Sequence, residues 1–139
     1  MRTVKDVMTH EIDCCYPEDN VFEVATKMKE LNVGAIPICD QKQQIMGMIT
    51  DRDIVVRGVA EKKPNATQVT DIMTNELITV TPDTNVQEAT NIMAQHQIRR
   101  LPVVENKQLI GIVSLGDFAV RNETDQSAGV ALSSISETY

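Results

Sequence analysis

An internal repeat constrains this chain of 139 residues more than any other feature. Residues 4–9 (VKDVMT) recur 65 residues later as residues 69–74 (VTDIMT), and Pro17 and Pro37 recur at the same spacing as Pro82 and Pro102. A second block, residues 47–53 (GMITDRD), recurs 64 residues later as residues 111–117 (GIVSLGD). A repeat of this length determines the architecture, so the chain is expected to contain one structural unit twice.

The first copy has a pattern of alternating helices and strands. We predict a helical turn from Val4 to Met8 and a short strand around Ile12 to Tyr16, which Pro17 ends. Asn20 and Glu23 form a capping-box pattern before a helix that Gly34 is expected to stop. The apolar residues at helical spacing in this helix are Val21, Val24, Ala25, Met28 and Leu31. Strands are then predicted over residues 35–39 and 45–50, with a helix from about Asp51 to Val59.

The second copy predicts the same elements in the same order. Asn85 is expected to cap a helix that contains Val86, Ala89, Ile92 and Met93, followed by strands over residues 101–105 and 109–114. The predicted domains are repeat 1 over residues 1–62, a polar linker over 63–68, repeat 2 over 69–124 and a C-terminal tail over 125–139, which either frays or forms a short helix on a partner subunit. Because each repeat is small and its strands are apolar, we expect an α/β fold, more closely α+β, with two βαββα repeats packed sheet to sheet about a pseudo-two-fold axis.

Each repeat has a hydroxyl residue and a carboxylate where a strand runs into a helix. These pairs are Thr50 with Asp53 and Ser114 with Asp117. Free N–H groups at a helix start favour phosphate, and a carboxylate accepts hydrogen bonds from neighbouring sugar hydroxyls. The alternative is structural: aspartate caps helices without any ligand, and Ser and Thr often bond nearby backbone. The two roles are compatible.

Composition excludes several classes of function. The formal charge is −7, from 13 basic and 20 acidic residues, which argues against binding to DNA or RNA. The sequence predicts neither a signal peptide nor a membrane span, so we expect a cytoplasmic location. The cysteines Cys14, Cys15 and Cys39 fit reduced thiols better than a disulfide framework, and His10 and His96 do not stand at metal-ligand spacing from them. No catalytic motif is found, so an enzyme is not expected.

These repeats resemble a tandem pair of CBS domains of the stand-alone bacterial type, a two-repeat arrangement called a Bateman module. The resemblance covers about Val4 to Glu123 and rests on the VKDVMT opening, the AIPI and RRLPVV strands and the glycine-to-aspartate endings. It implies a homodimer that binds adenosine-containing ligands in clefts between the repeats and regulates another protein. AMP, ADP or ATP is favoured over S-adenosylmethionine or NAD, and no cofactor is required.

The resemblance also implies which residues contact the ligand. Asp53 and Asp117 match ribose-binding carboxylates, and Thr50 and Ser114 match the hydroxyls beside them. Basic residues near phosphate are expected at Arg52, Arg99 and Arg100, of which at least one of the adjacent pair faces solvent. The expected walls of the base site are Ile36, Pro37, Cys15, Leu101, Pro102, Thr79 and Val80. The counterparts of Arg99 and Arg100 are Gly34 and Ala35, so the two sites should differ in charge. The alternative function is a ligand-free interaction module.

Overall fold

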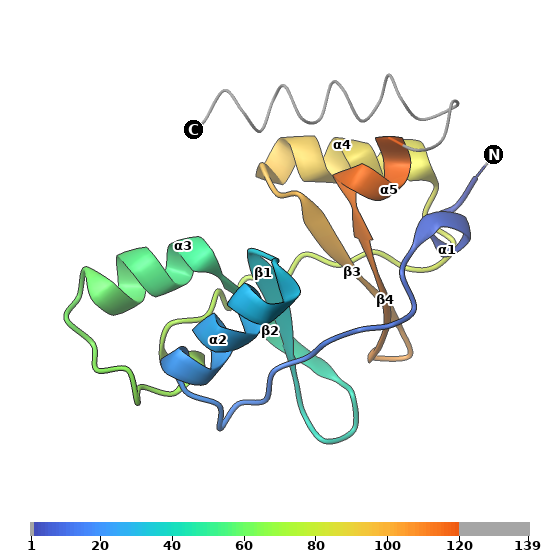
Figure 1. The fold of residues 1–139 in the computed structure, drawn as a ribbon. Coiled ribbons are helices and arrows are strands. Elements are labelled where there is room, and N and C mark those ends of the chain that lie inside the picture. The colour runs from blue at the N-terminus through green and yellow to red at the C-terminus, as the bar shows by residue number, and fades with distance from the viewer. Residues whose placement is uncertain (1, 120–139) are drawn as a thin grey trace. The chain divides into compact units, whose positions relative to one another are not determined.

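The described residues, 2–119 of the computed structural model, form two compact units (Figure 1). The first-repeat unit comprises Asp13–Leu77, and the described part of the second-repeat unit comprises residues 2–12 together with residues 78–119. The predicted tail, residues 125–139, lies outside the described residues.

A helix and a two-stranded antiparallel sheet dominate the first-repeat unit. Helix α2 spans Val21–Leu31, and strand β1 (Ala35–Cys39) pairs with β2 (Ile45–Thr50). The chain then turns into α3 (Asp51–Asp53), continues as the π-helix η1 (Ile54–Val59) and later forms the short helix η2 (Val69–Asp71). One face of α2 contributes Val24 and Met28 to a core that also contains Ile36, Ile38, Ile49 and Ile72. Burial of these aliphatic side chains is the main stabilising contribution to the unit.

The second-repeat unit repeats this arrangement. It contains α1 (Val4–Val7), α4 (Val86–His96), the antiparallel strands β3 (Arg100–Glu105) and β4 (Gln108–Ser114), and α5 (Leu115–Ala119). Each hairpin has one register irregularity, between Ile38 and Cys39 in one unit and between Val103 and Val104 in the other, at equivalent positions. The strands are antiparallel, so the fold is a two-repeat α+β module, as the sequence predicted.

The opening segments of the two repeats, residues 4–9 and 69–74, are exchanged. Each segment belongs to the unit that contains the hairpin of the other repeat. Thr9 bridges Ile112 of β4, so the first opening segment joins the sheet of the second repeat. Thr74 bridges Met48 of β2 in the same way, with its N–H donating to the Met48 carbonyl over 3.0 Å. The apolar side chains of both segments are buried, which explains why the compact units do not coincide with the sequence repeats.

Several local details differ from the sequence predictions. Helix α2 ends at Leu31, because Asn32 adopts the left-handed conformation (φ 56°), whereas the stop was predicted at Gly34. Residues 12–16 do not form a strand: Cys15 makes only an isolated parallel bridge to Ile38. The helix predicted over residues 51–59 is α-helical only in its first turn. The predicted linker, residues 63–68, is part of the first-repeat unit, since the Val21 N–H donates to the Thr67 carbonyl over 2.9 Å.

Gly47 is required where the exchanged segment crosses β2. A Cβ atom at this position would lie 2.9 Å from the Thr74 carbonyl oxygen and 3.0 Å from the Met73 sulfur. The backbone oxygen cannot move without breaking the bridge, so we expect Gly47→Ala to lower the free energy of unfolding by about 1–3 kcal/mol in urea denaturation. Gly58→Ala is the matched control, because its Cβ would meet only the Ile72 side chain at 3.8 Å. This control should be neutral or stabilising by up to about 1 kcal/mol, and equal losses in both variants would contradict the steric explanation.

Candidate ligand-binding junctions

Both predicted carboxylates accept a hydrogen bond from the residue that precedes their helix, as the third helical residue does in a capping box. In the first-repeat unit the Thr50 N–H donates to Asp53 Oδ2 and the Asp53 N–H donates to Thr50 Oγ1, both over 3.0 Å. In the second-repeat unit the Ser114 N–H donates to Asp117 Oδ2 over 2.8 Å, and the Asp117 N–H donates to Ser114 Oγ over 3.4 Å. The structural role that the sequence left open is therefore confirmed for both aspartates. Their contact with a ligand stays a prediction.

The two aspartates differ in how fully the protein engages them. Asp53 is only 8% exposed, and the Thr74 hydroxyl donates to it over 3.2 Å to Oδ1 and 3.1 Å to Oδ2. Asp117 is half-buried, and within the described part of the chain only the Ser114 N–H donates to its carboxylate. Thr9, the counterpart of Thr74, makes no such bond among the described residues. Among the described residues, Asp117 consequently has more unused acceptor capacity than Asp53 has.

The two strand-to-helix junctions, at residues 50–53 and 114–117, differ in the sign of their net charge, and the basic residues are the main reason. Arg100 lies directly across the strand pair from Ser114, and the neighbouring Arg99 accepts a hydrogen bond at its carbonyl from the Leu115 N–H over 3.1 Å. Arg99 is exposed and Arg100 is half-buried, which confirms that one of the pair faces solvent. With Asp117, the second-repeat junction has two positive charges and one negative charge.

The equivalent positions of the first-repeat junction are not basic. Ala35 lies across from Thr50, and the Gly34 carbonyl accepts from the Asp51 N–H over 2.9 Å. The exposed carboxylate of Asp51 stands where the second repeat has Leu115, and with Arg52 and Asp53 it gives this junction one positive and two negative charges. Asp51 was not among the predicted site residues, although its difference from Leu115 is visible in the aligned repeats. A phosphate group is therefore favoured at the second-repeat junction.

The expected walls of the base site are mostly buried core residues. In the first-repeat unit the Cys15 N–H donates to the Pro37 carbonyl over 2.9 Å, and in the other unit the Val80 N–H donates to the Pro102 carbonyl over 3.0 Å. The structure thus brings Cys15 to Ile36 and Pro37, and it brings Val80 to Leu101 and Pro102. Thr79 is exposed. The other six would be buried in this fold without any ligand, so the part of all seven in binding stays a prediction.

The described residues contain neither a cluster of metal ligands nor a helix that could span a membrane. No group of three or more His, Cys, Asp or Glu side chains among residues 2–119 could hold a metal ion. Within the same residues, every helix is too short or too polar to cross a bilayer.

The family comparison covers both repeats. The model of the CBS domain matches residues 4–58 and 69–121. This chain belongs to the CBS domain family. As a CBS pair it is similar to the CBS domain-containing protein YhcV of Bacillus subtilis, with 45% identity over 136 residues that cover 98% of this chain and 96% of the relative. It is also 35% identical to hypoxic response protein 1 of Mycobacterium tuberculosis over 120 residues, 86% of this chain and 84% of that protein.

Solved structures of CBS pairs share the fold. A crystal structure of Hypoxic Response Protein I with two coordinated zinc ions has a TM-score of 0.79 at 35% identity and covers 86% of this chain and 98% of that one. The CBS domain pair of protein MJ0100, in complex with 5'-methylthioadenosine and S-adenosyl-L-methionine, has a TM-score of 0.76 at 27% identity, over 86% and 94% of the two chains. CBSX2 in complex with AMP has a TM-score of 0.73 at 27% identity, over 83% and 91%. CBS pairs are regulatory modules, and some of them bind adenosine compounds.

Proposed function

We propose that this CBS pair is a regulatory module that binds AMP, ADP or ATP at its second-repeat junction and signals the bound state to another protein. The observation on which this depends is the half-buried Asp117 carboxylate, which retains an unused acceptor beside Ser114 and the basic pair Arg99 and Arg100. The carboxylate would accept from ribose hydroxyls and a guanidinium would bind phosphate oxygens. The predicted cleft between the repeats stays a prediction from the sequence, as does the cytoplasmic location.

The charge of this junction supports a phosphate-bearing ligand over S-adenosylmethionine. A nucleotide phosphate gains from the positive charge of this junction, whereas the sulfonium of S-adenosylmethionine is itself cationic. The complex of CBSX2 with AMP supports the nucleotide, and the complex of the MJ0100 pair supports the wider adenosine class. A bound nucleotide would regulate a partner only through a difference in affinity between two conformations of the module.

The direct test is thermal unfolding of the full chain with a panel of adenine compounds. Ligand that binds only the folded state raises the melting temperature by mass action, and at about 100 times the Kd it adds about 2.7 kcal/mol to the free energy of unfolding. We expect AMP, ADP or ATP to raise the melting temperature and S-adenosylmethionine to raise it less. An unchanged melting temperature with every compound at millimolar concentration would contradict the proposal.

Two exposed arginines, one at each junction, allow the proposed phosphate contact to be tested with a matched control. We expect Arg99→Ala to weaken AMP binding about tenfold in calorimetry while it leaves adenosine binding unchanged, because a charge-assisted hydrogen bond to phosphate contributes about 1.5–3 kcal/mol. Arg52→Ala, at the acidic first-repeat junction, should change neither affinity. If Arg52→Ala weakens AMP binding as much as Arg99→Ala, the assignment of the phosphate to the second-repeat junction is wrong.

The ligand-free alternative applies best to the first-repeat junction. There Asp53 is already engaged by internal donors, and the net charge is negative. We propose that this junction is structural and stays empty under conditions that fill the other one. Calorimetry with AMP should then give one site per chain, and two sites of similar affinity would contradict this assignment.

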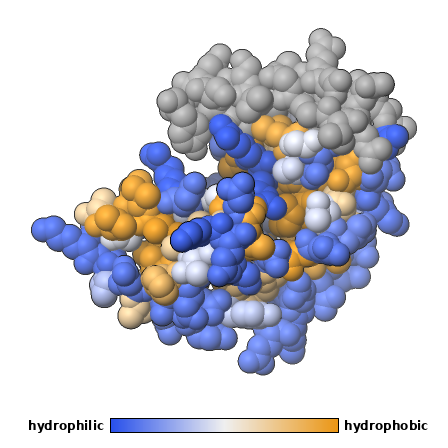
Figure 2. Space-filling view, viewed as in Figure 1, coloured by the Kyte–Doolittle hydropathy of each residue, from blue (hydrophilic) through white to orange (hydrophobic). Residues whose placement is uncertain are grey.

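We also propose that the module forms a homodimer. Val55, Val56 and Val59 of η1 are 58%, 45% and 69% exposed, and Figure 2 shows apolar surface over this helix, which Figure 1 draws in green. Apolar side chains grouped in this way favour burial against a second chain. Val59→Glu should shift the mass in sedimentation equilibrium from dimer to monomer, and an unchanged mass would exclude this helix from the interface.

A further inference from the structure

Cys14 and Cys39 form a close pair of thiols that the proposed function does not use. Their sulfur atoms are 3.2 Å apart, and both residues belong to the first-repeat unit. Cys39 ends β1, and Cys14 precedes the residue that bridges Ile38, so two fixed backbone segments hold the sulfur atoms together. All three cysteines of the chain are free thiols in this structure. The pair therefore has the proximity that a disulfide needs, without a large movement of the backbone.

The surroundings of Cys14 favour its thiolate. The Lys27 ammonium, on α2, donates to the Cys14 carbonyl over 2.6 Å, and the Gln43 amide lies 3.7 Å from the Cys14 sulfur. The hydrogen bond with Cys39 is the largest cause that lowers the pKa of Cys14, and the nearby Lys27 charge lowers it further, against the raising effects of burial and of Asp13. Burial raises the pKa of the neighbouring Cys15 to about 11.

The two sulfur atoms of the pair differ in pKa and in access to solvent. The hydrogen bond with Cys14, together with burial, raises the pKa of Cys39 well above its usual range. Cys39 is fully buried, whereas Cys14 is 8% exposed. Since the thiolate is the nucleophile, Cys14 is the residue that a small oxidant would meet first.

We propose that Cys14 and Cys39 are a reversible redox site, in which hydrogen peroxide converts the two thiols to a disulfide. The Cys14 thiolate attacks one peroxide oxygen, the O–O bond breaks, and the departing hydroxide takes up the proton that Cys14 released and becomes water. Cys14 is then a sulfenic acid. Cys39 sulfur attacks Cys14 sulfur, the S–O bond breaks, and the Cys39 proton leaves with the hydroxide as a second water. Two thiols are oxidised, one hydrogen peroxide is reduced, and a dithiol reverses the change.

The disulfide would fix the segment before α2 to the end of β1. It would close a loop between residues that are 25 positions apart, which restricts the unfolded chain. We therefore expect the oxidised protein to melt at a higher temperature than the reduced protein. The redox reaction needs no nucleotide, so the outcome of its test is independent of the outcome of the tests of the proposed function.

The test uses the reduced full chain in EDTA, treated with hydrogen peroxide and then alkylated with N-ethylmaleimide under denaturing conditions. Intact mass should show one alkylated cysteine after peroxide and three after subsequent dithiothreitol. Because Cys14 and Cys15 are adjacent, variants must identify the partners. Cys15→Ala should still form the disulfide, with no alkylated cysteine, and Cys14→Ser should retain two. Cys39→Ser should retain one, Cys15, with Cys14 trapped as a sulfenic acid that adds one oxygen to the mass. Three alkylated cysteines after peroxide, or loss of two thiols in Cys39→Ser, would overturn the proposal.

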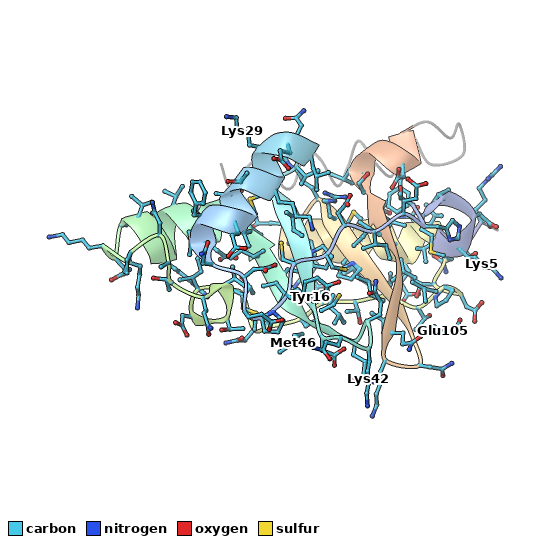
Figure 3. All side chains as sticks on the ribbon, turned by 60° about the horizontal axis from the view of Figure 1, so that its bottom comes forward. Lys5, Tyr16, Lys29, Lys42, Met46 and Glu105 are labelled. Carbon is cyan, nitrogen blue, oxygen red and sulfur yellow. The ribbon has the colours of Figure 1, made fainter. Side chains whose placement is uncertain are left out.

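The pH dependence tests the role of Lys27 as a positioning residue. The groups that face Cys14 are Cys39 on β1, Lys27 on α2, Gln43 in the β1–β2 turn and Asp13 in its own segment. Below the pKa of Cys14 the oxidation rate should rise about tenfold per pH unit, because the thiolate fraction does. Lys27→Gln should move the midpoint of this rise to higher pH, and Lys29→Gln, at the C-terminal end of the same helix (Figure 3), should not. Equal midpoints in the two variants would overturn the role of Lys27.

Discussion

Asp117→Ala is expected to lower the affinity for AMP by about 10- to 100-fold in isothermal calorimetry. The lost interaction is a charge-assisted pair of hydrogen bonds to the ribose hydroxyls, with a net contribution of about 1.5–3 kcal/mol, and each 1.4 kcal/mol corresponds to tenfold in Kd. The protein should remain folded, because the half-buried carboxylate has only one donor among the described residues, the Ser114 N–H. The cost in stability should be that of a helix cap, about 1 kcal/mol.

Two control variants make this test specific. Asp117→Asn keeps an acceptor oxygen but removes the charge, so its affinity should lie between those of the wild type and Asp117→Ala. Asp53→Ala should change the affinity for AMP less than about threefold, since the proposed ligand does not contact the first-repeat junction. If Asp117→Ala binds AMP as tightly as the wild type does, the ligand contact assigned to this carboxylate is wrong.

Asp53→Ala is expected to have the opposite profile, with a large effect on stability. The substitution removes the side-chain half of the capping box at the start of α3, the bond from the Thr50 N–H, and leaves the Thr74 hydroxyl without its acceptor. Loss of a capping bond costs about 1 kcal/mol, and leaving the half-buried Thr74 hydroxyl unsatisfied costs about 1–3 kcal/mol, so we expect the free energy of unfolding to fall by about 2–4 kcal/mol in urea denaturation.

The partner of this bond provides the second half of the test. Thr74→Val removes the hydroxyl and keeps the shape, so it should cost less than Asp53→Ala, and the double variant should cost less than the sum of the two. Additive losses would show that the two side chains do not interact. A loss for Asp53→Ala no larger than for Asp117→Ala would contradict the structural role of the buried carboxylate.

Elements with a strong local signal were predicted well. The capping box of Asn20 and Glu23, the cap at Asn85 and both hairpins are set by neighbouring residues, and the structure confirms them. The stop at Gly34 was wrong because Asn32, two residues earlier, also tolerates the left-handed conformation. The strand over residues 12–16 was wrong because apolar composition alone does not specify a pairing partner for more than one residue.

The differences between the two junctions could be predicted only in part. The basic pair Arg99 and Arg100 and its uncharged counterparts were visible in the aligned repeats. The engagement of Asp53 was not, because Thr74 lies 21 residues away along the chain and its hydroxyl reaches the carboxylate only through the exchanged opening segment. The closeness of Cys14 and Cys39 is equally non-local, so a count of cysteines could not identify it.

The exchanged opening segments determine how this molecule can be dissected. A fragment that ends at residue 62 would retain α2 and the first hairpin but would lack Val69, Ile72 and Met73, which complete their core. It would also contain Val4, Val7 and Met8 without the strands on which they pack. Fragments that end at the repeat boundaries should therefore expose apolar side chains and aggregate. A fragment of residues 13–77 would retain its complete hydrophobic core. Deletion of the first nine residues should accordingly destabilise the second repeat, although the deleted residues belong to the first repeat.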